Sequence, residues 1–220
     1  MSQRKAISTL PSGFIDRLSE QFPKQAKKIL KTFHRRPPVI RVNTLLTSLE
    51  ALSVRLEKEG MKVRRSALLP EALLITKGDR RTLSKMPEYH QGHFYIQSLA
   101  SQLIVKALDP QPGEKILDLC AAPGSKTSQI AIRMQKRGEL IANDEKRNRF
   151  FRLKGMMKLQ QMDDFVDCKC YPGQNYPHYH PEYFDRVLVD TSCSSEATFI
   201  DGKLSSLGYW SQHKVKSFSR

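Results

Sequence analysis

The chain has 220 residues, of which 39% are hydrophobic and 27% charged, a composition typical of globular rather than disordered proteins. No apolar stretch approaches the roughly 20 residues of a transmembrane helix, and the first residues lack the apolar run of a secretion signal, so we expect a cytoplasmic protein with no membrane partner. Lys and Arg outnumber Asp and Glu by 37 to 22, a net charge of +15, and residues 1–85 alone hold 19 basic and 7 acidic side chains. Such a field attracts polyanions, above all nucleic acid; acidic lipids, acidic proteins or a merely solvated surface are the alternatives.

The first third of the chain predicts a helical segment followed by a small α+β lobe. Apolar residues three and four apart indicate an amphipathic helix over 12–33 that Pro23 breaks in two. The elements expected after it are strands at 39–43, 61–63 and 72–76, and a helix at 48–59 that ends at Gly60. We therefore expect a helical segment over 1–36 and an α+β lobe over 37–86.

The remainder, 87–220, predicts a second domain in which helices and strands alternate. Helices are expected at 97–108, 125–136 and 146–159, and strands at 115–119, 139–142, 165–169 and 186–189, with a proline- and aromatic-rich loop over 171–184. Alternation of this kind is typical of an α/β fold with a parallel, doubly wound sheet. Ligands of such sheets bind beyond the carboxyl ends of the strands.

A turn of small residues follows the first of these strands, with the sequence Asp118-Leu-Cys-Ala-Ala-Pro-Gly-Ser-Lys-Thr127. Small side chains let backbone N–H groups and a helix N-terminus approach a ligand, although tight turns also need them for packing alone. The turn is neither a phosphate-binding P-loop, which would need glycine at 120 and 125, nor a G-x-G-x-x-G dinucleotide loop.

Two further strand ends carry candidate site residues. Asp144 lies about 20 residues beyond the first turn, where a carboxylate can hold ribose hydroxyls or simply cap the next helix. Asp190 ends the last strand and is followed by Cys193, a thiol placed for chemistry or, as is commoner for a lone cysteine, a small buried hydrophobe. The four cysteines are expected to be reduced. Zinc binding is not expected, because the spacings of Cys168 with Cys170 and of His178 with His180 are poor for chelation.

The motifs together, including Arg41-Val-Asn-Thr44, Gln97 to Ser101, Asp118 to Thr127, Ala142-Asn-Asp144 and Asp190 to Ser194, resemble the Nop/Sun family of RNA cytosine-5 methyltransferases. The resemblance implies a class I, Rossmann-like methyltransferase domain that binds S-adenosylmethionine, and an RNA substrate, either rRNA or tRNA. The cofactor-binding residues it implies are Cys120, Ala121, Ala122, Pro123, Gly124, Ser125, Lys126, Asp144, Arg149 and Asp190. The arginines expected to hold RNA phosphates are Arg35, Arg36, Arg41, Arg64 and Arg65.

The family's chemistry uses two cysteines, because a thiolate must add to cytosine C6 before C5 can accept a methyl group. By resemblance, Cys193 is the cysteine that assists release of the methylated base, and the covalent nucleophile belongs to a later Thr-Cys motif. No Thr-Cys pair occurs in the chain, Ser192 replaces the proline that usually precedes the first cysteine, and Pro172-Gly173 stands where the family has Asp-Gly.

These departures predict a sheet that is incomplete at its C-terminal side and a chain that forms no covalent cytosine adduct alone. A second polypeptide that completes the sheet is then a possible partner. A catalytically incomplete RNA-binding protein, or one subunit of a split enzyme, is the alternative function. DNA cytosine methylation, with Cys193 as the nucleophile, is a third hypothesis.

Overall fold

The computed structural model describes residues 10–33, 36–179, 181–191, 193, 210, 211, 213 and 215. The chain divides into two compact units, one of residues 1–36 with 192–220 and the other of residues 37–191. His180, considered above as a zinc ligand, lies outside the described residues. Within the described part, no helix is long and apolar enough to cross a membrane.

The first unit contains helices α2 (Ser12–Gln21) and α3 (Ala26–Leu30), which confirm the predicted break around Pro23. Their apolar side chains form a small core of Leu10, Phe14, Leu18 and Ala26. Trp210 packs edge-on against Phe14, with 6.0 Å between the ring centroids.

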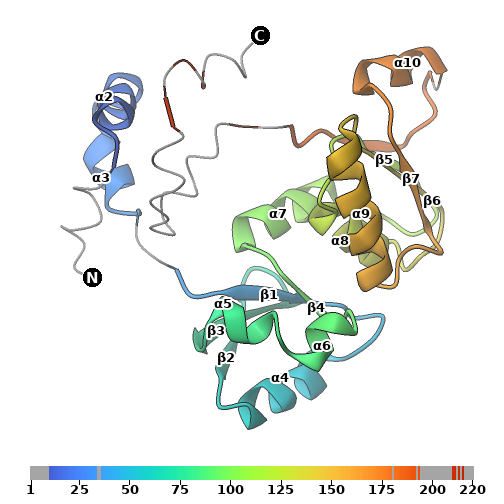
Figure 1. The fold of residues 1–220 in the computed structure, drawn as a ribbon, viewed down its shortest axis with the longest axis horizontal. Coiled ribbons are helices and arrows are strands. Elements are labelled where there is room, and N and C mark those ends of the chain that lie inside the picture. The colour runs from blue at the N-terminus through green and yellow to red at the C-terminus, as the bar shows by residue number, and fades with distance from the viewer. Residues whose placement is uncertain are drawn as a thin grey trace. The chain divides into compact units, whose positions relative to one another are not determined.

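The second unit begins with a four-stranded antiparallel sheet in the order β2-β3-β1-β4 (Figure 1). Its strands are β1 (Val39–Val42), β2 (Lys62–Arg65), β3 (Ala72–Lys77) and β4 (Phe94–Ile96). The accompanying helices are α4 (Leu49–Lys58), α5 (Arg80–Leu83) and α6 (Pro87–His90). The Ser48 hydroxyl accepts a hydrogen bond from the Ala51 N–H and so starts α4.

Strand β4 carries the small lobe past the boundary expected at Met86. It pairs antiparallel with β1, and its Phe94 is fully buried in the same core as Met86. The three-residue strand gives no periodic signal in the sequence, so the expected boundary was placed too early.

A parallel sheet follows in the order β7-β6-β5-β8, which confirms the predicted doubly wound α/β arrangement. Its strands are β5 (Lys115–Asp118), β6 (Glu139–Asn143), β7 (Val166–Lys169) and β8 (Arg186–Leu188). The helices of this part are α7 (Leu99–Leu108), α8 (Ser125–Arg133) and α9 (Arg147–Leu159). The predicted loop over 171–184 contains two short helices, η1 (Gly173–Asn175) and α10 (Tyr176–Tyr179), so it is partly helical.

Buried polar side chains connect the small lobe to α8. Arg41 on β1 donates hydrogen bonds to the Gln97 side chain (2.8 Å), the Ser125 carbonyl (2.6 Å) and the Ser128 hydroxyl (2.7 Å). Strand β1 is buried on both faces, since Ile40 and Val42 point into the lobe's own core while Arg41 points toward α8. The small lobe is therefore fixed directly to the helix that follows the small-residue turn.

Candidate functional site

The candidate site lies where the strand order of the parallel sheet reverses. The chain moves from β5 outward to β6 and β7, then returns to pair β8 with the other side of β5. Asp118 is opposite Ala142 in β6 and Leu188 in β8, so the carboxyl ends of these strands meet at one edge. A crevice at such a switch point is the usual ligand site of this architecture.

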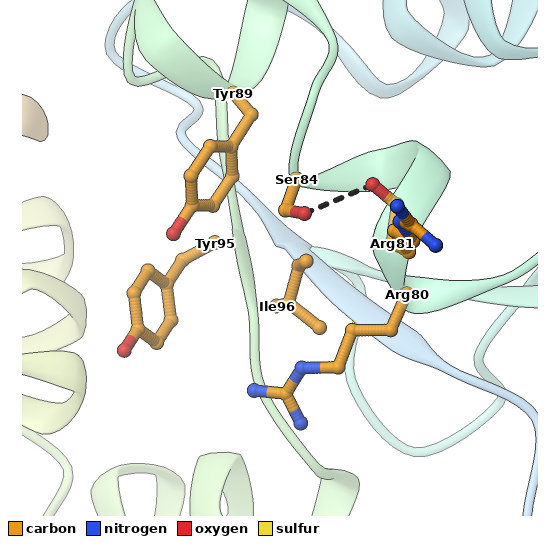
Figure 2. Close-up of a pocket in the computed structure, with 6 residues that line it drawn as sticks. All are labelled: Arg80, Arg81, Ser84, Tyr89, Tyr95 and Ile96. Carbon is orange, nitrogen blue, oxygen red and sulfur yellow. Dashed lines mark hydrogen bonds between the residues drawn. The ribbon is translucent and has the colours of Figure 1, made fainter.

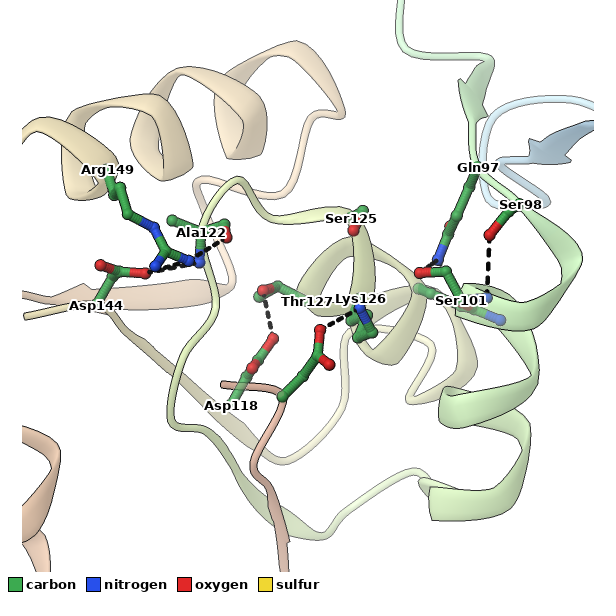
Figure 3. A network of polar contacts seen from close by, with 12 residues as sticks. Gln97, Ser98, Ser101, Asp118, Ala122, Ser125, Lys126, Thr127, Asp144 and Arg149 are labelled. Atoms are coloured by element: carbon green, nitrogen blue, oxygen red, sulfur yellow. Dashed lines mark hydrogen bonds and ion pairs between the residues drawn. The ribbon is translucent and has the colours of Figure 1, made fainter. Parts of the chain in front are cut away.

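Asp118, the last residue of β5, is buried beneath this edge with 1% of its surface exposed. Its Oδ2 accepts a hydrogen bond from the Thr127 hydroxyl at 2.7 Å (Figure 3). Burial raises the pKa of Asp118 to about 7, although the bond from Thr127 and the charge of Lys126 both act to lower it. The carboxyl group is therefore close to half-ionised near neutral pH.

The small-residue turn is held by backbone hydrogen bonds and by close packing. The Ala121 N–H donates to the Asn143 carbonyl at 2.7 Å, and the Gly124 N–H donates to the Ala121 carbonyl at 2.8 Å. Gly124 has φ +107°, and a Cβ there would lie 2.6 Å from the Cε of Met157. Glycine thus lets the turn lie against α9 in a conformation that L side chains rarely adopt.

Asp144 is tied to the turn from the end of β6. Its Oδ2 accepts from the Ala122 N–H at 3.3 Å and pairs with the Arg149 guanidinium at 3.1 Å, while Oδ1 accepts from the Lys146 N–H at 3.2 Å. Arg149 also donates to the Ala122 carbonyl at 2.8 Å. The bond from Lys146 N–H forms a turn ahead of α9, which has no side-chain cap. A carboxylate has about four lone-pair positions, so these contacts leave one acceptor position on Asp144.

Lys126, in the first turn of α8, reaches across the switch point to Asp190. Its Nζ lies 2.5 Å from Asp190 Oδ2, and 45% of the Asp190 side chain is exposed. In Figure 3 the Asp144–Arg149 and Asp118–Thr127 pairs lie on either side of the turn. The structure therefore brings together the candidates from all three strand ends.

Cys120 and Cys193 differ in their surroundings. Cys120 is partly buried within the turn, and burial, followed by the nearby Asp144 charge, raises the pKa of its thiol. A neutral thiol of this kind is a poor nucleophile. Cys193 is exposed and belongs to the other compact unit, so its predicted role stays a prediction.

Asn143 is a positioning residue that was not singled out from the sequence. Its Nδ2 donates to the carbonyls of Leu119 (3.1 Å) and Tyr171 (3.0 Å), and its Oδ1 accepts from the Tyr171 N–H (3.0 Å). The segment after β7, which includes Gly173, is thereby held beside the turn, where a Cβ on Gly173 would lie 3.2 Å from the Leu119 side chain. An amide at a strand end was the available signal, because buried amides must find partners.

The predicted phosphate contact by Arg41 is wrong. Its surface is only 1% exposed and its guanidinium is taken up by the contacts with Gln97, Ser125 and Ser128. Arg36, Arg64 and Arg65 are exposed, the last in an ion pair with Glu50, and Arg35 lies outside the described residues. Among the described residues, no three His, Cys, Asp or Glu side chains lie close enough to hold a metal ion.

Comparison with known proteins relates both parts of the chain to one group of enzymes. Residues 105–203 match the family described as 16S rRNA methyltransferase RsmB/F, and residues 10–80 match the ferredoxin-like domain of RsmF/B-like methyltransferases. A 26S rRNA (cytosine-C(5))-methyltransferase of Caenorhabditis elegans is 38% identical over 159 residues, which cover 72% of this chain and 24% of that protein. Ribosomal RNA small subunit methyltransferase F of Psychromonas ingrahamii is 31% identical over 218 residues, covering 96% of this chain and 45% of that protein.

Solved structures share the fold. The crystal structure of PH0851 matches with a TM-score of 0.86 and 30% identity, covering 96% of this chain and 47% of that one. A methyltransferase homologue from Pyrococcus horikoshii matches with a TM-score of 0.75 and 27% identity, covering 93% and 68%. The chain thus has a class I, Rossmann-like methyltransferase sheet preceded by a small α+β lobe, and it spans less than half the length of the two curated relatives. On these matches, the chain belongs to the Nop/Sun family of RNA cytosine-5 methyltransferases.

Proposed function

We propose that the protein acts in the transfer of a methyl group from S-adenosylmethionine to C5 of a cytosine in rRNA or tRNA. The observation that carries the proposal is the convergence of Asp118, Asp144 and Asp190 at the switch point of the parallel sheet, around a turn of small residues. Family membership supports the reaction type. The names of the curated relatives, which are mostly rRNA enzymes and include the human tRNA (cytosine(72)-C(5))-methyltransferase, support the substrate class.

The residues at the switch point fit S-adenosylmethionine, whose polar groups include two ribose hydroxyls, an ammonium and a carboxylate. The acceptor position that remains on Asp144 suits a ribose hydroxyl. Asp118 and Asp190 supply negative charge for the ammonium, and the N-terminus of α8 with Lys126 supplies positive potential for the carboxylate. In this proposal residues Cys120 to Lys126 wrap the cofactor, and Arg149 orients the Asp144 side chain.

The bound cofactor supplies an electrophilic methyl group. A thiolate that adds to C6 would make cytosine C5 nucleophilic, so that C5 takes the methyl group as S-adenosylhomocysteine leaves. A base would then remove the C5 proton, and the C5–C6 double bond re-forms as the bond from C6 to sulfur breaks. We assign Cys193 to assist that release, as the family resemblance implies. The exposed Arg36, Arg64 and Arg65 hold phosphates of an RNA whose target cytosine is unpaired or turned out of its helix.

Calorimetric titration of the chain with S-adenosylmethionine tests the cofactor site. We expect wild-type binding, and a loss of at least tenfold in affinity for Asp144→Ala, because a hydrogen bond to a charged group is worth about 1.5–3 kcal/mol. Asp144→Asn, which keeps one acceptor oxygen, should lie between the two. Asp163→Ala is the matched control, since it removes an exposed carboxylate from the loop before β7.

Circular dichroism must show that each variant is folded. RNA binding, measured by fluorescence anisotropy, should be the same for Asp144→Ala as for the wild type. A folded wild-type chain that binds no S-adenosylmethionine, or Asp144 variants that bind it unchanged, would contradict the proposed site.

A further inference from the structure

A pocket lies on the small lobe, outside the cluster at the switch point. It has a volume of about 370 Å³ and is formed by the edge strand β4 together with α5 and α6 (Figure 2). Its lining residues are Arg80, Arg81, Ser84, Tyr89, Tyr95 and Ile96. Two arginines and two tyrosines without a carboxylate among them make a combination suited to an anionic ligand with a flat ring system.

The two tyrosines form a fixed aromatic wall. The Tyr89 ring packs against the fully buried Phe94, with 5.7 Å between the ring centroids. Tyr95 lies on the opposite face of β4 from Phe94, and the buried Arg41 guanidinium sits 5.8 Å from its ring centroid. In Figure 2 both phenol groups point to the same side of the pocket. Because both rings are anchored from behind, a ligand that stacks on them would not have to order them first.

The cationic wall comes from α5. The Arg80 side chain extends from this helix toward Tyr95 (Figure 2). Burial raises the pKa of the Tyr95 hydroxyl, and the charge of Arg80 is among the smaller effects that lower it. Within the described part of the small lobe, the ion pairs are made by other arginines, so Arg80 is available to an external anion. Next to it, hydrogen bonds from the Thr82 N–H and hydroxyl lower the pKa of Asp79, and the Arg81 N–H and charge contribute less, so Asp79 is an anion beside Arg81 rather than beside Arg80.

We infer that this pocket binds one unpaired nucleotide of the RNA, with its base stacked on Tyr95 and its phosphate on Arg80. Aromatic side chains and guanidinium groups are the usual partners of bases and phosphates in single-stranded RNA. A phosphate alone would make no use of the aromatic wall, and a base in a duplex has no free face to stack. The inference rests on the proposed function, because it locates part of the RNA substrate that this function requires.

The experiment measures binding of a fluorescein-labelled single-stranded RNA of about 12 nucleotides to the full chain by anisotropy. We expect Tyr95→Ala to weaken binding about tenfold, as loss of one stacked base does, and Tyr95→Phe to leave it within about twofold. Arg80→Ala should weaken binding severalfold and reduce the salt dependence by about one phosphate contact. Arg137→Ala is the charge-matched comparison, because it removes an exposed arginine that lies just before β6, at the amino end of the parallel sheet.

Photo-crosslinking tests the pocket in the wild-type protein, so its result does not depend on whether the Tyr95 variants fold. RNA that contains 5-iodouridine should crosslink wild-type protein at Tyr95 or Tyr89, identified by mass spectrometry. Arg80→Ala should reduce that crosslink more than Arg137→Ala does.

The outcomes separate this inference from the function on which it rests. Crosslinks elsewhere, with Arg80→Ala and Tyr95→Ala binding RNA like the wild type, would overturn the pocket while RNA binding itself stands. A wild-type chain that binds S-adenosylmethionine but no RNA would overturn the proposed RNA substrate and the pocket together. If free UMP matched the affinity of the oligonucleotide, the pocket would be a mononucleotide site rather than an RNA site.

Discussion

Replacing Asp118 by Asn should change how the stability of the protein depends on pH. The folded state holds the pKa of Asp118 at about 7 through burial, against 3.8 for an ordinary aspartate. Between these two values the folded state keeps a proton that the unfolded state has lost, so wild-type stability falls by about 1.4 kcal/mol for each pH unit of increase. The loss is complete above pH 7, where both states are ionised.

Asparagine has nearly the same shape, can still accept the hydrogen bond from Thr127, and has no charge to bury. The free energy of unfolding of Asp118→Asn, relative to the wild type, should therefore rise by about 3 kcal/mol between pH 5 and pH 8. Urea denaturation followed by circular dichroism measures it, and taking the difference between the two proteins cancels other titrating groups that both share. The reasoning would be refuted if the free energies of unfolding of the two proteins changed equally with pH, or if the wild type became more stable relative to the variant as pH rises.

Two other substitutions test how the small lobe is joined to the parallel sheet. Arg41→Ala should lower the free energy of unfolding by about 3–5 kcal/mol, because it leaves a cavity and buried acceptors without a donor. In the same urea titration, replacement of the exposed Arg64 by Ala should lower that free energy by less than about 0.5 kcal/mol. Equal costs would mean that Arg41 is not buried in the network described. Gly92→Ala should cost about 3 kcal/mol, since its Cβ would lie 2.4 Å from the Leu159 carbonyl oxygen, whereas Gly60→Ala, with similar φ but open space, should cost about 1 kcal/mol. Similar melting temperatures for the two glycine variants would argue against that close backbone approach.

The elements of the parallel sheet could be predicted from the sequence because each has its own local signal. Strands such as β5 and β6 are short apolar runs bounded by turn residues, and helix α8 begins directly after the small-residue turn. The sheet order then follows from alternation, which brings Asp118, Asp144 and Asp190 to one edge. This part of the site could therefore be predicted from local patterns and from one general rule, that the carboxyl ends of the strands in an alternating α/β fold meet at one edge.

The rest of the fold and of the site depends on contacts between residues far apart in the sequence, which a local sequence pattern does not reveal. Helices α5 and α6 have four residues each and β4 has three, too few for any periodicity. Arg41 was expected on the surface because charged residues rarely lie in a core. Its strand, however, is covered on both faces, by the lobe's own core and by α8. The pocket around Tyr95 could not be predicted either, because its walls come from short elements that are separate in the sequence.

The junction between the lobe and the sheet is polar, and this bears on how the proposed RNA and cofactor sites are aligned. Asn43 donates from Nδ2 to the carbonyls of Gly92 (3.1 Å) and Gln160 (3.3 Å), and Arg41 donates to Ser125 in the first turn of α8. Apolar surfaces can slide with little loss, whereas buried hydrogen bonds are satisfied in only one arrangement. The guanidinium that lies against Tyr95 in the small lobe therefore also holds the start of α8. A nucleotide stacked on Tyr95 would thus be kept at a fixed distance from the cofactor turn, as methyl transfer to one chosen base requires.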